Sequence, residues 1–134
     1  MKKKLILYST TDGQTLLICQ RIKEILNEKA EVSLLALPEC SENDLKKFDH
    51  IILGASIRYG KHKPAVHKFV ELNREILEEK RTAFFTVNVV ARKPNKNSPA
   101  TNPYMNKFLN ATSWNPDSLG VFAGKIDYPK YGFF

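Results

Sequence analysis

The sequence predicts an α/β protein built on a parallel sheet with helices on both faces. Short apolar runs alternate along the chain with segments whose apolar residues recur at helical spacing, a pattern typical of βαβ units. The apolar runs are continuous rather than alternating, as in strands that are buried on both faces. With 134 residues, the chain has the length of a single domain, so we expect residues 1–134 to form one.

The first strand, residues 4–8, runs into a loop of hydroxyl and amide side chains, and a helical pattern follows over residues 14–29. Unpaired backbone N–H groups gather where a helix begins, so such a loop favours an anion, and we expect a phosphate. A plain Ser/Thr cap is the alternative. Neither Gly-Lys-Ser/Thr nor Gly-x-Gly-x-x-Gly is present, so no nucleoside-triphosphate or dinucleotide loop is predicted. The side chains with donors are Ser9, Thr10, Thr11, Gln14 and Thr15.

The remaining elements continue the alternation. A second strand is closed by Pro38, and Pro64 suits the first turn of a long amphipathic helix. Between them, residues 41–48 are interpreted as a short helix or an ordered loop. The predicted elements after the first helix are strands over residues 31–37, 50–56, 82–88 and 119–123, a helix over residues 64–79, and a helix that Thr101, Asn102 and Pro103 cap and that runs to residue 111.

Polar residues follow three of the predicted strands, after Tyr8, after Gly54 and at Asn88. In open parallel sheets, ligands bind beyond the carboxyl ends of the strands, where the strand order reverses. We therefore expect the three loops to converge on one ligand. In the second loop, Tyr59 follows a strand end and precedes a glycine, so its ring either stacks on a planar cofactor or is a surface tyrosine.

Composition excludes several classes of protein. No apolar run approaches the ~20 residues of a membrane span, and the apolar residues after the basic start are fewer than the about 7–15 of a signal peptide, which predicts a cytoplasmic location. Cys19 and Cys40 are too far apart for a C-x-x-C motif and agree with a reducing compartment. Cys19 is expected to pack as a small hydrophobe. With three histidines and no clustered ligands, we expect no metal site.

The net charge of +7 is concentrated in the second half of the chain. Residues 1–79 hold 13 Lys/Arg and 12 Asp/Glu, whereas residues 80–134 hold 8 Lys/Arg and 2 Asp. Such an excess attracts an anionic membrane surface at about 1 kcal/mol per cation, or a nucleic acid. No nucleic-acid motif accompanies it, so we expect no nucleic-acid partner. The aromatic tail over residues 128–134 suits a membrane interface, or consists of core aromatics.

Two sets of residues carry a family resemblance. The first loop, with Thr10, Gly13 and Thr15, resembles the flavodoxin signature for the phosphate of flavin mononucleotide (FMN), although Cys19 replaces its later alanine. The stretches over residues 54–60, 87–94 and 104–114 resemble the bacterial menaquinone-dependent protoporphyrinogen oxidases, which are membrane-associated flavodoxin-like enzymes of haem synthesis. The similarity runs along essentially the whole chain.

The resemblance implies a flavodoxin-like three-layer α/β/α sandwich with a parallel five-stranded sheet of order 2-1-3-4-5. It also implies where FMN binds, with the phosphate at the first loop and the isoalloxazine between the second and third. The implied phosphate residues are Ser9, Thr10, Asp12, Gly13, Gln14 and Thr15, and the implied isoalloxazine residues are Ser56, Ile57, Arg58, Tyr59, Gly60, Asn88, Val89, Val90, Ala91 and Arg92.

The implied reaction is the oxidation of protoporphyrinogen IX to protoporphyrin IX, with electrons passing through FMN to menaquinone or another quinone. It would take place on the cytoplasmic face of the inner membrane, by peripheral association. Arg58, Arg92 and Lys93 would bind the two propionates of the substrate, or are solvated surface cations. The alternatives are a flavodoxin-type electron carrier, which the basic charge disfavours, and an inactive truncated fragment.

The end of the sequence departs from the family pattern. A flavodoxin-like domain completes its fifth strand after an insertion and then adds a helix of about 11–12 residues or more. The sequence ends at Phe134, so we expect the final strand segment and the helix to be missing. An uncovered apolar face would favour self-association, with weaker FMN binding and lower stability than in a completed domain.

Overall fold

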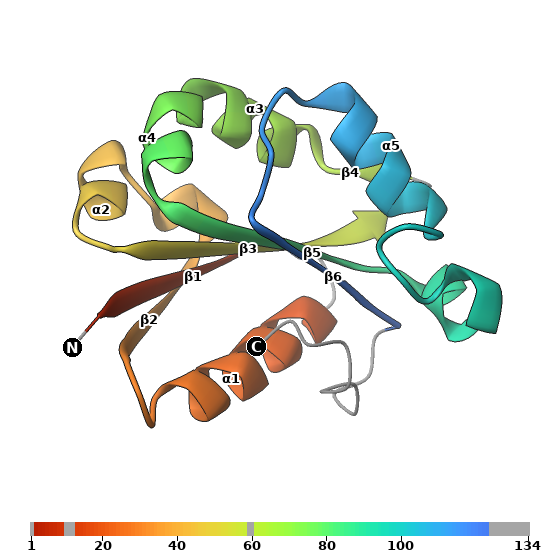
Figure 1. Ribbon diagram of the computed structural model, residues 1–134, viewed down its shortest axis with the longest axis horizontal. Coiled ribbons are helices and arrows are strands. Elements are labelled where there is room, and N and C mark those ends of the chain that lie inside the picture. The colour runs from red at the N-terminus through yellow and green to blue at the C-terminus, as the bar shows by residue number, and fades with distance from the viewer. Residues whose placement is uncertain (1, 10–12, 59–60, 124–134) are drawn as a thin grey trace.

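The computed structural model describes residues 2–9, 13–58 and 61–123, and its centre is a six-stranded sheet (Figure 1). Five strands are parallel in the order β2-β1-β3-β5-β6, which confirms the predicted order 2-1-3-4-5. The additional strand, β4, pairs antiparallel with β3 and was not predicted. The strands are β1 (Lys3–Ser9), β2 (Glu31–Ala36), β3 (His50–Arg58), β4 (Lys61–His62), β5 (Arg81–Val87) and β6 (Ser118–Phe122).

Helices cover both faces of the sheet, so the predicted three-layer sandwich is confirmed. Among the described helices, α1 lies alone on one face and the other four lie on the opposite face (Figure 1). The helices are α1 (Gln14–Leu26), α2 (Glu42–Lys46), α3 (Pro64–Leu72), α4 (Arg74–Glu79) and α5 (Pro103–Ala111), with 3-10 turns η1 (Leu37–Glu39), η2 (Val89–Arg92) and η3 (Pro94–Lys96).

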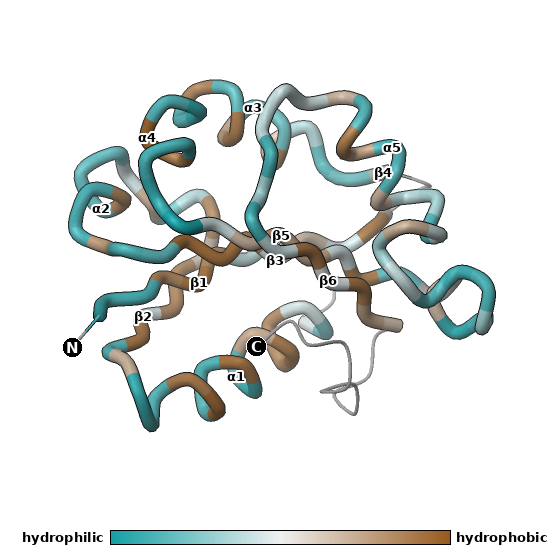
Figure 2. Tube along the Cα trace, viewed as in Figure 1, coloured by the Kyte–Doolittle hydropathy of each residue, from teal (hydrophilic) through white to brown (hydrophobic). Residues whose placement is uncertain are grey.

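Continuous apolar runs form the central strands because both faces of the sheet are covered. Leu5, Ile6 and Leu7 of β1 are all fully buried, and successive residues belong to opposite core clusters. The cluster beneath α2 to α5 contains Leu5 and Leu7, whereas the cluster beneath α1 contains Ile6 and Cys19. Figure 2 shows hydrophobic colour along the central strands and along one side of α1. Cys19 thus packs as the small hydrophobe that the sequence predicts.

A close approach between two neighbouring strands explains the glycine in β3. Gly54 pairs with Phe85 of β5, and a Cβ added at Gly54 would overlap the Phe85 ring. The ring therefore occupies the space that any side chain at this position would fill.

The predicted helix over residues 64–79 is wrong in one respect, because Asn73 interrupts it and separates α3 from α4. The Asn73 side-chain amide donates to Phe69 O at 2.9 Å, and the Asn73 backbone N–H donates to the same carbonyl. Such side-chain bonds compete with a continuous helical ladder. The segment over residues 41–48 contains a short helix, α2, whose Ser41 and Asp44 form a capping box.

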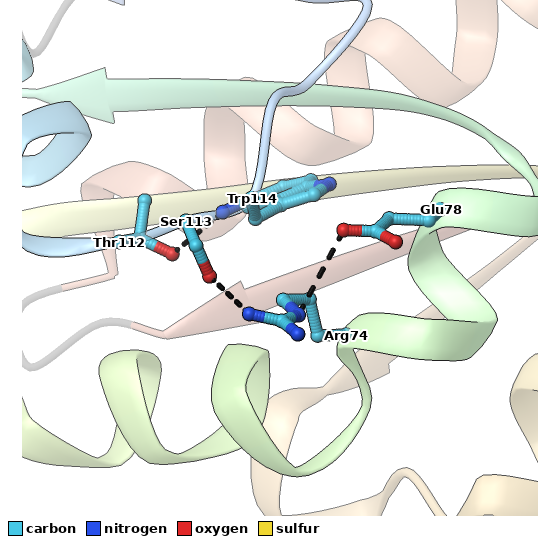
Figure 3. A network of polar contacts seen from close by, with 5 residues as sticks. All are labelled: Arg74, Glu78, Thr112, Ser113 and Trp114. Carbon is cyan, nitrogen blue, oxygen red and sulfur yellow. Dashed lines mark hydrogen bonds and ion pairs between the residues drawn. The ribbon is translucent and has the colours of Figure 1, made fainter.

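Polar contacts connect α4 to the segment that leads to β6 (Figure 3). The Arg74 guanidinium donates to Ser113 Oγ and lies 3.7 Å from a Glu78 carboxylate oxygen. The Trp114 backbone N–H donates to Thr112 Oγ1 at 3.2 Å, and the Trp114 ring is buried edge-on against Phe84. Because Arg74 and Glu78 are exposed, the ion pair contributes at most about 1 kcal/mol, and the buried indole is the stronger anchor.

Among the helices formed by the described residues, none has the length and apolar character needed to cross a membrane.

Candidate functional site

The carboxyl ends of β1, β3 and β5 lie side by side at one edge of the sheet. Ser9, the last residue of β1, is paired with Ala55, and Ser56 is paired with Val87 near the end of β5. Ser9, Ser56 and Asn88 are all buried polar residues. The three loops that the sequence predicts to converge therefore begin at neighbouring positions of this edge.

The loop after β1 leads into the first turn of α1. Gly13 is the N-cap and has a left-handed backbone (φ 84°), and as a glycine it makes no side-chain cap hydrogen bond itself. Thr15, in the first turn, is fully buried, and its Oγ1 has no hydrogen-bond partner among the described residues. A buried hydroxyl without a partner is costly, and at a helix N-terminus a bound anion can supply its acceptor. Gln14 is exposed, and Thr10 and Asp12 lie outside the described residues.

β3 pairs antiparallel with β4, which follows it in the chain. Ile57 pairs with His62, and the Arg58 backbone pairs with that of Lys61. The side chain of Arg58, and Tyr59 with Gly60, lie outside the described part, so their predicted contacts with a cofactor stay predictions.

The loop after β5 continues as η2 and η3. Asn88 donates its backbone N–H to Phe122 O at 3.0 Å, and its side-chain Oδ1 accepts from the Ala91 N–H at 3.2 Å. Ala91 is buried, whereas Arg92 and Lys93 are exposed at the surface of this loop. Val89 and Val90 belong to η2, and their side chains lie outside the described part. Two cations are thus available to an anionic ligand at this edge.

Two buried asparagine side chains hold the third loop to α5. Asn88 Nδ2 donates to Asn102 Oδ1 at 3.2 Å, and Asn102 Nδ2 donates to Asn88 Oδ1 at 3.0 Å. Asn102 Oδ1 also accepts from the backbone N–H groups of Tyr104 and Met105, which confirms the predicted cap of this helix. Asn102 Nδ2 donates to Lys96 O at 2.9 Å as well, so one side chain supports two turns. The Asn88 amide is therefore used in positioning the loop.

His62 of β4 points into the space between the sheet and the helices above it. Its Nε2 and Thr86 Oγ1 share a hydrogen bond of 2.9 Å, and the rings of Phe84 and Phe108 lie edge-on to the imidazole. Burial lowers the pKa of His62 to about 4, and electrostatic interactions with His67 and Lys107 lower it in the same direction. The imidazole is therefore neutral near pH 7.

His62, Thr86 and Asn102 are the residues of this edge that sequence reasoning missed as parts of the site. Asn102 carried the signal of a helix cap, but its pairing with Asn88 spans 14 positions. His62 had no local signal, because only the hairpin turns its ring inward.

The other reactive side chains are remote or inert. Burial raises the pKa of the Cys19 thiol to about 12 and that of Cys40 to about 11, so neither is a thiolate at neutral pH. His50 lies at the amino end of β3, away from the three loops. The described residues include no group of three His, Cys, Asp or Glu side chains that would hold a metal ion.

Comparison with known proteins identifies a flavodoxin domain in the chain. Residues 5–134 match the family model described as a flavodoxin domain. A protein named protoporphyrinogen IX dehydrogenase [quinone] from Leishmania major is 42% identical over 134 residues, which are 98% of this chain and 58% of that protein. The protein of the same name from Escherichia coli K12 is 39% identical over 133 residues, 98% of this chain and 74% of that protein. The chain thus spans only part of the length of these relatives.

Solved structures share the fold. The solution structure of the two-electron reduced flavodoxin of Megasphaera elsdenii has a TM-score of 0.73 and 15% identity, and the match covers 92% of this chain and 88% of that one. The crystal structure of the Fusobacterium nucleatum flavodoxin bound to flavin mononucleotide has a TM-score of 0.56 and 20% identity, covering 68% of this chain and 55% of that one. By its family model, which its fold supports, this chain belongs to the flavodoxin-domain family.

Proposed function

We propose that the chain binds FMN and takes part in the oxidation of protoporphyrinogen IX to protoporphyrin IX, with a quinone such as menaquinone as the electron acceptor. The relatives that are 39–42% identical carry the name of this activity. The resemblance of the second and third loops to the corresponding enzymes also supports the proposal.

The observation that supports FMN most strongly is the buried hydroxyl of Thr15 at the start of α1. Next to it, Gly13 is the N-cap of α1 and has a left-handed backbone with φ 84°. A phosphate can supply an acceptor for the Thr15 hydroxyl, and its charge is favoured at a helix N-terminus. The described residues therefore fit the phosphate end of FMN. Ser9, Gly13, Gln14 and Thr15 would hold it, together with Thr10 and Asp12.

The loops after β3 and β5 would hold the isoalloxazine. Ser56 and Ile57 lie near the end of β3, just before the first of these loops, and η2 forms the start of the second. When bound, FMN would supply the redox chemistry, in which electrons are accepted from one substrate and passed to the next. Amino-acid side chains do not provide this chemistry. The residues of this chain bind and orient the reactants and keep the two loops in place.

The exposed cations Arg92 and Lys93 would bind the propionates of the porphyrinogen. A guanidinium presents paired donors that match a carboxylate, and an ammonium adds a compact positive charge. We also propose that the basic second half of the chain associates peripherally with an anionic membrane surface, where a lipid-soluble quinone is found.

Reconstitution of the chain with FMN, followed by an anaerobic assay with protoporphyrinogen IX, tests the proposal. Porphyrin fluorescence should develop when menadione is added and should not develop without a quinone. Flavin binding without porphyrin formation would instead favour a flavodoxin-type electron carrier. A chain that binds no flavin would refute the proposed function altogether.

A further inference from the structure

A continuous set of buried polar side chains lies beneath the two loops that follow β3 and β5. It consists of His62, Thr86, Asn88 and Asn102, here called the His62–Asn102 network, and all four residues are buried. His62 Nε2 and Thr86 Oγ1 are 2.9 Å apart, and Asn88 Nδ2 donates to the same oxygen at 3.4 Å. The paired amides of Asn88 and Asn102 complete the network.

Each member of the network comes from a different place in the fold. His62 belongs to the β4 hairpin, Thr86 to β5, Asn88 to the start of the third loop and Asn102 to the N-cap of α5. The network also binds backbone, because Asn88 accepts from the Ala91 N–H and Asn102 donates to a carbonyl of η3. The two segments therefore share one buried atom, Thr86 Oγ1, which lies within hydrogen-bond distance of His62 Nε2 and accepts from Asn88 Nδ2.

The environment of His62 favours retention of its bond to Thr86. Aromatic rings surround the imidazole, with centroid distances of 5.7 Å to Phe84 and 5.4 Å to Phe108. A neutral imidazole in such surroundings loses free energy when a ring nitrogen lacks a partner. Thr86 is also fully buried, so water does not readily replace its hydroxyl as that partner.

We infer that His62 is a positioning residue that couples the loop after β3 to the loop after β5 through Thr86 and Asn88, and thereby sets the relative placement of the two loops around the isoalloxazine. The part of this inference that concerns the flavin rests on the proposed function, whereas the coupling between the loops does not. His62 acts through Thr86 and is not assigned a contact with FMN or substrate.

Amide hydrogen exchange in the FMN-free chain tests the coupling. Thr86→Val removes the hydroxyl at nearly constant volume, and His62→Leu removes the imidazole but keeps an apolar side chain. Each variant should accelerate exchange about fivefold to tenfold in both the β4 hairpin and the loop from Asn88 to Asn102, because each removes a net hydrogen bond. His62→Gln, whose amide can reach Thr86, should restore protection. Acceleration confined to the substituted loop, or none at all, would overturn the inference.

Thr82→Val is the matched control variant. Thr82 is a buried threonine of the same strand and the same sheet face, four positions from Thr86 and at the opposite end of β5. This variant should leave exchange in both loops as in the wild-type chain. The amides of α1 serve as an internal reference in every variant, since α1 covers the other face of the sheet. Equal acceleration by Thr82→Val and Thr86→Val would show general destabilisation and would overturn the coupling.

The flavin provides a second readout that general stability does not move. In the FMN-bound chain, His62→Leu and Thr86→Val should shift the flavin midpoint potential and change its visible circular dichroism. His62→Gln and Thr82→Val should match the wild-type chain in both. If FMN binds and all variants share the wild-type potential and spectrum, the positioning role is wrong and the proposed function stands. If the wild-type chain binds no FMN, the proposed function and the flavin part of the inference fail, while exchange still decides the coupling.

Discussion

Thr15→Val is predicted to change stability and FMN binding in opposite directions. Thr15 is 0% exposed, and its Oγ1 has no partner among the described residues. A buried hydroxyl left without a hydrogen bond costs about 1–3 kcal/mol, and valine has nearly the same shape and helix propensity. The substitution should therefore raise the free energy of unfolding of the FMN-free chain by about 1–2 kcal/mol, at the lower end of that cost.

The same substitution should weaken FMN binding. A hydrogen bond from a hydroxyl to a charged phosphate contributes about 1.5–3 kcal/mol, which corresponds to an increase of about 10- to 150-fold in the Kd of FMN. A residue with a purely structural role would lose stability when its polar group is removed. A gain in stability together with a loss of FMN affinity would show that Thr15 serves ligand binding at the expense of stability.

Urea unfolding of the FMN-free chain gives the stability, and quenching of flavin fluorescence gives the Kd. Thr86→Val is the matched control, because Thr86 is also 0% exposed but its hydroxyl has a partner in His62. That variant should lose about 1–3 kcal/mol of stability. Thr15→Ser, which keeps the hydroxyl, should bind FMN with nearly wild-type affinity. A Thr15→Val chain that is destabilised like Thr86→Val, or that binds FMN as the wild type does, would refute the reasoning.

Three further changes have defined outcomes. Gly54→Ala places a methyl group in the Phe85 ring and should lower the unfolding free energy by about 3 kcal/mol or more, measured by urea denaturation. Burial lowers the pKa of His62 from 6.5 to about 4, so between these pH values the unfolded chain binds more protons than the folded chain. The free energy of unfolding should therefore fall by up to about 3 kcal/mol as the pH drops from 6.5 to 4. His62→Gln should remove that part of the pH dependence of unfolding. Replacing Arg92 and Lys93 together by glutamine should raise the KM for porphyrinogen several-fold, at about 1 kcal/mol or less per exposed contact, with little change in kcat.

The charge control for the last change is a double glutamine substitution of Lys29 and Lys47, which are also exposed. Both lie just before strands, at the opposite edge of the sheet from the three loops. A similar rise in KM for this control would contradict a specific role for Arg92 and Lys93 and would indicate a general effect of charge. For Gly54→Ala, wild-type stability would contradict the close approach of Phe85.

The strands, and the order of strands and helices along the chain, could be predicted because continuous apolar runs carry a strong local signal. Leu5 to Leu7 are buried from both sides. The helix cap at Asn102 could be predicted from Asn102 and its neighbours in the sequence, Thr101 and Pro103. The strand order came from the family resemblance rather than from the residues alone. The interruption at Asn73 was missed because a single side-chain bond to Phe69 O decides it within an otherwise amphipathic pattern.

The candidate site was predictable as three loops at one edge, but not as a set of contacts. The hydroxyl-rich loop before α1 was visible in the sequence, whereas the burial of Thr15 without a partner depends on how α1 packs against the sheet. In the His62–Asn102 network, the contact between His62 and Thr86 joins residues that are 24 positions apart in the sequence. No local sequence pattern predicts such a contact. Propensity and periodicity describe short segments, and contacts of this kind are decided by tertiary packing.

Parallel titrations of the wild-type chain with FMN and with riboflavin, which lacks the phosphate, test the central claim most directly. FMN should bind at one site per chain and about 10-fold or more tighter than riboflavin, because only FMN places an anion at the start of α1 and beside Thr15. Equal affinity for the two flavins, or no binding of FMN, would contradict the claim that this edge of the sheet is a flavin mononucleotide site.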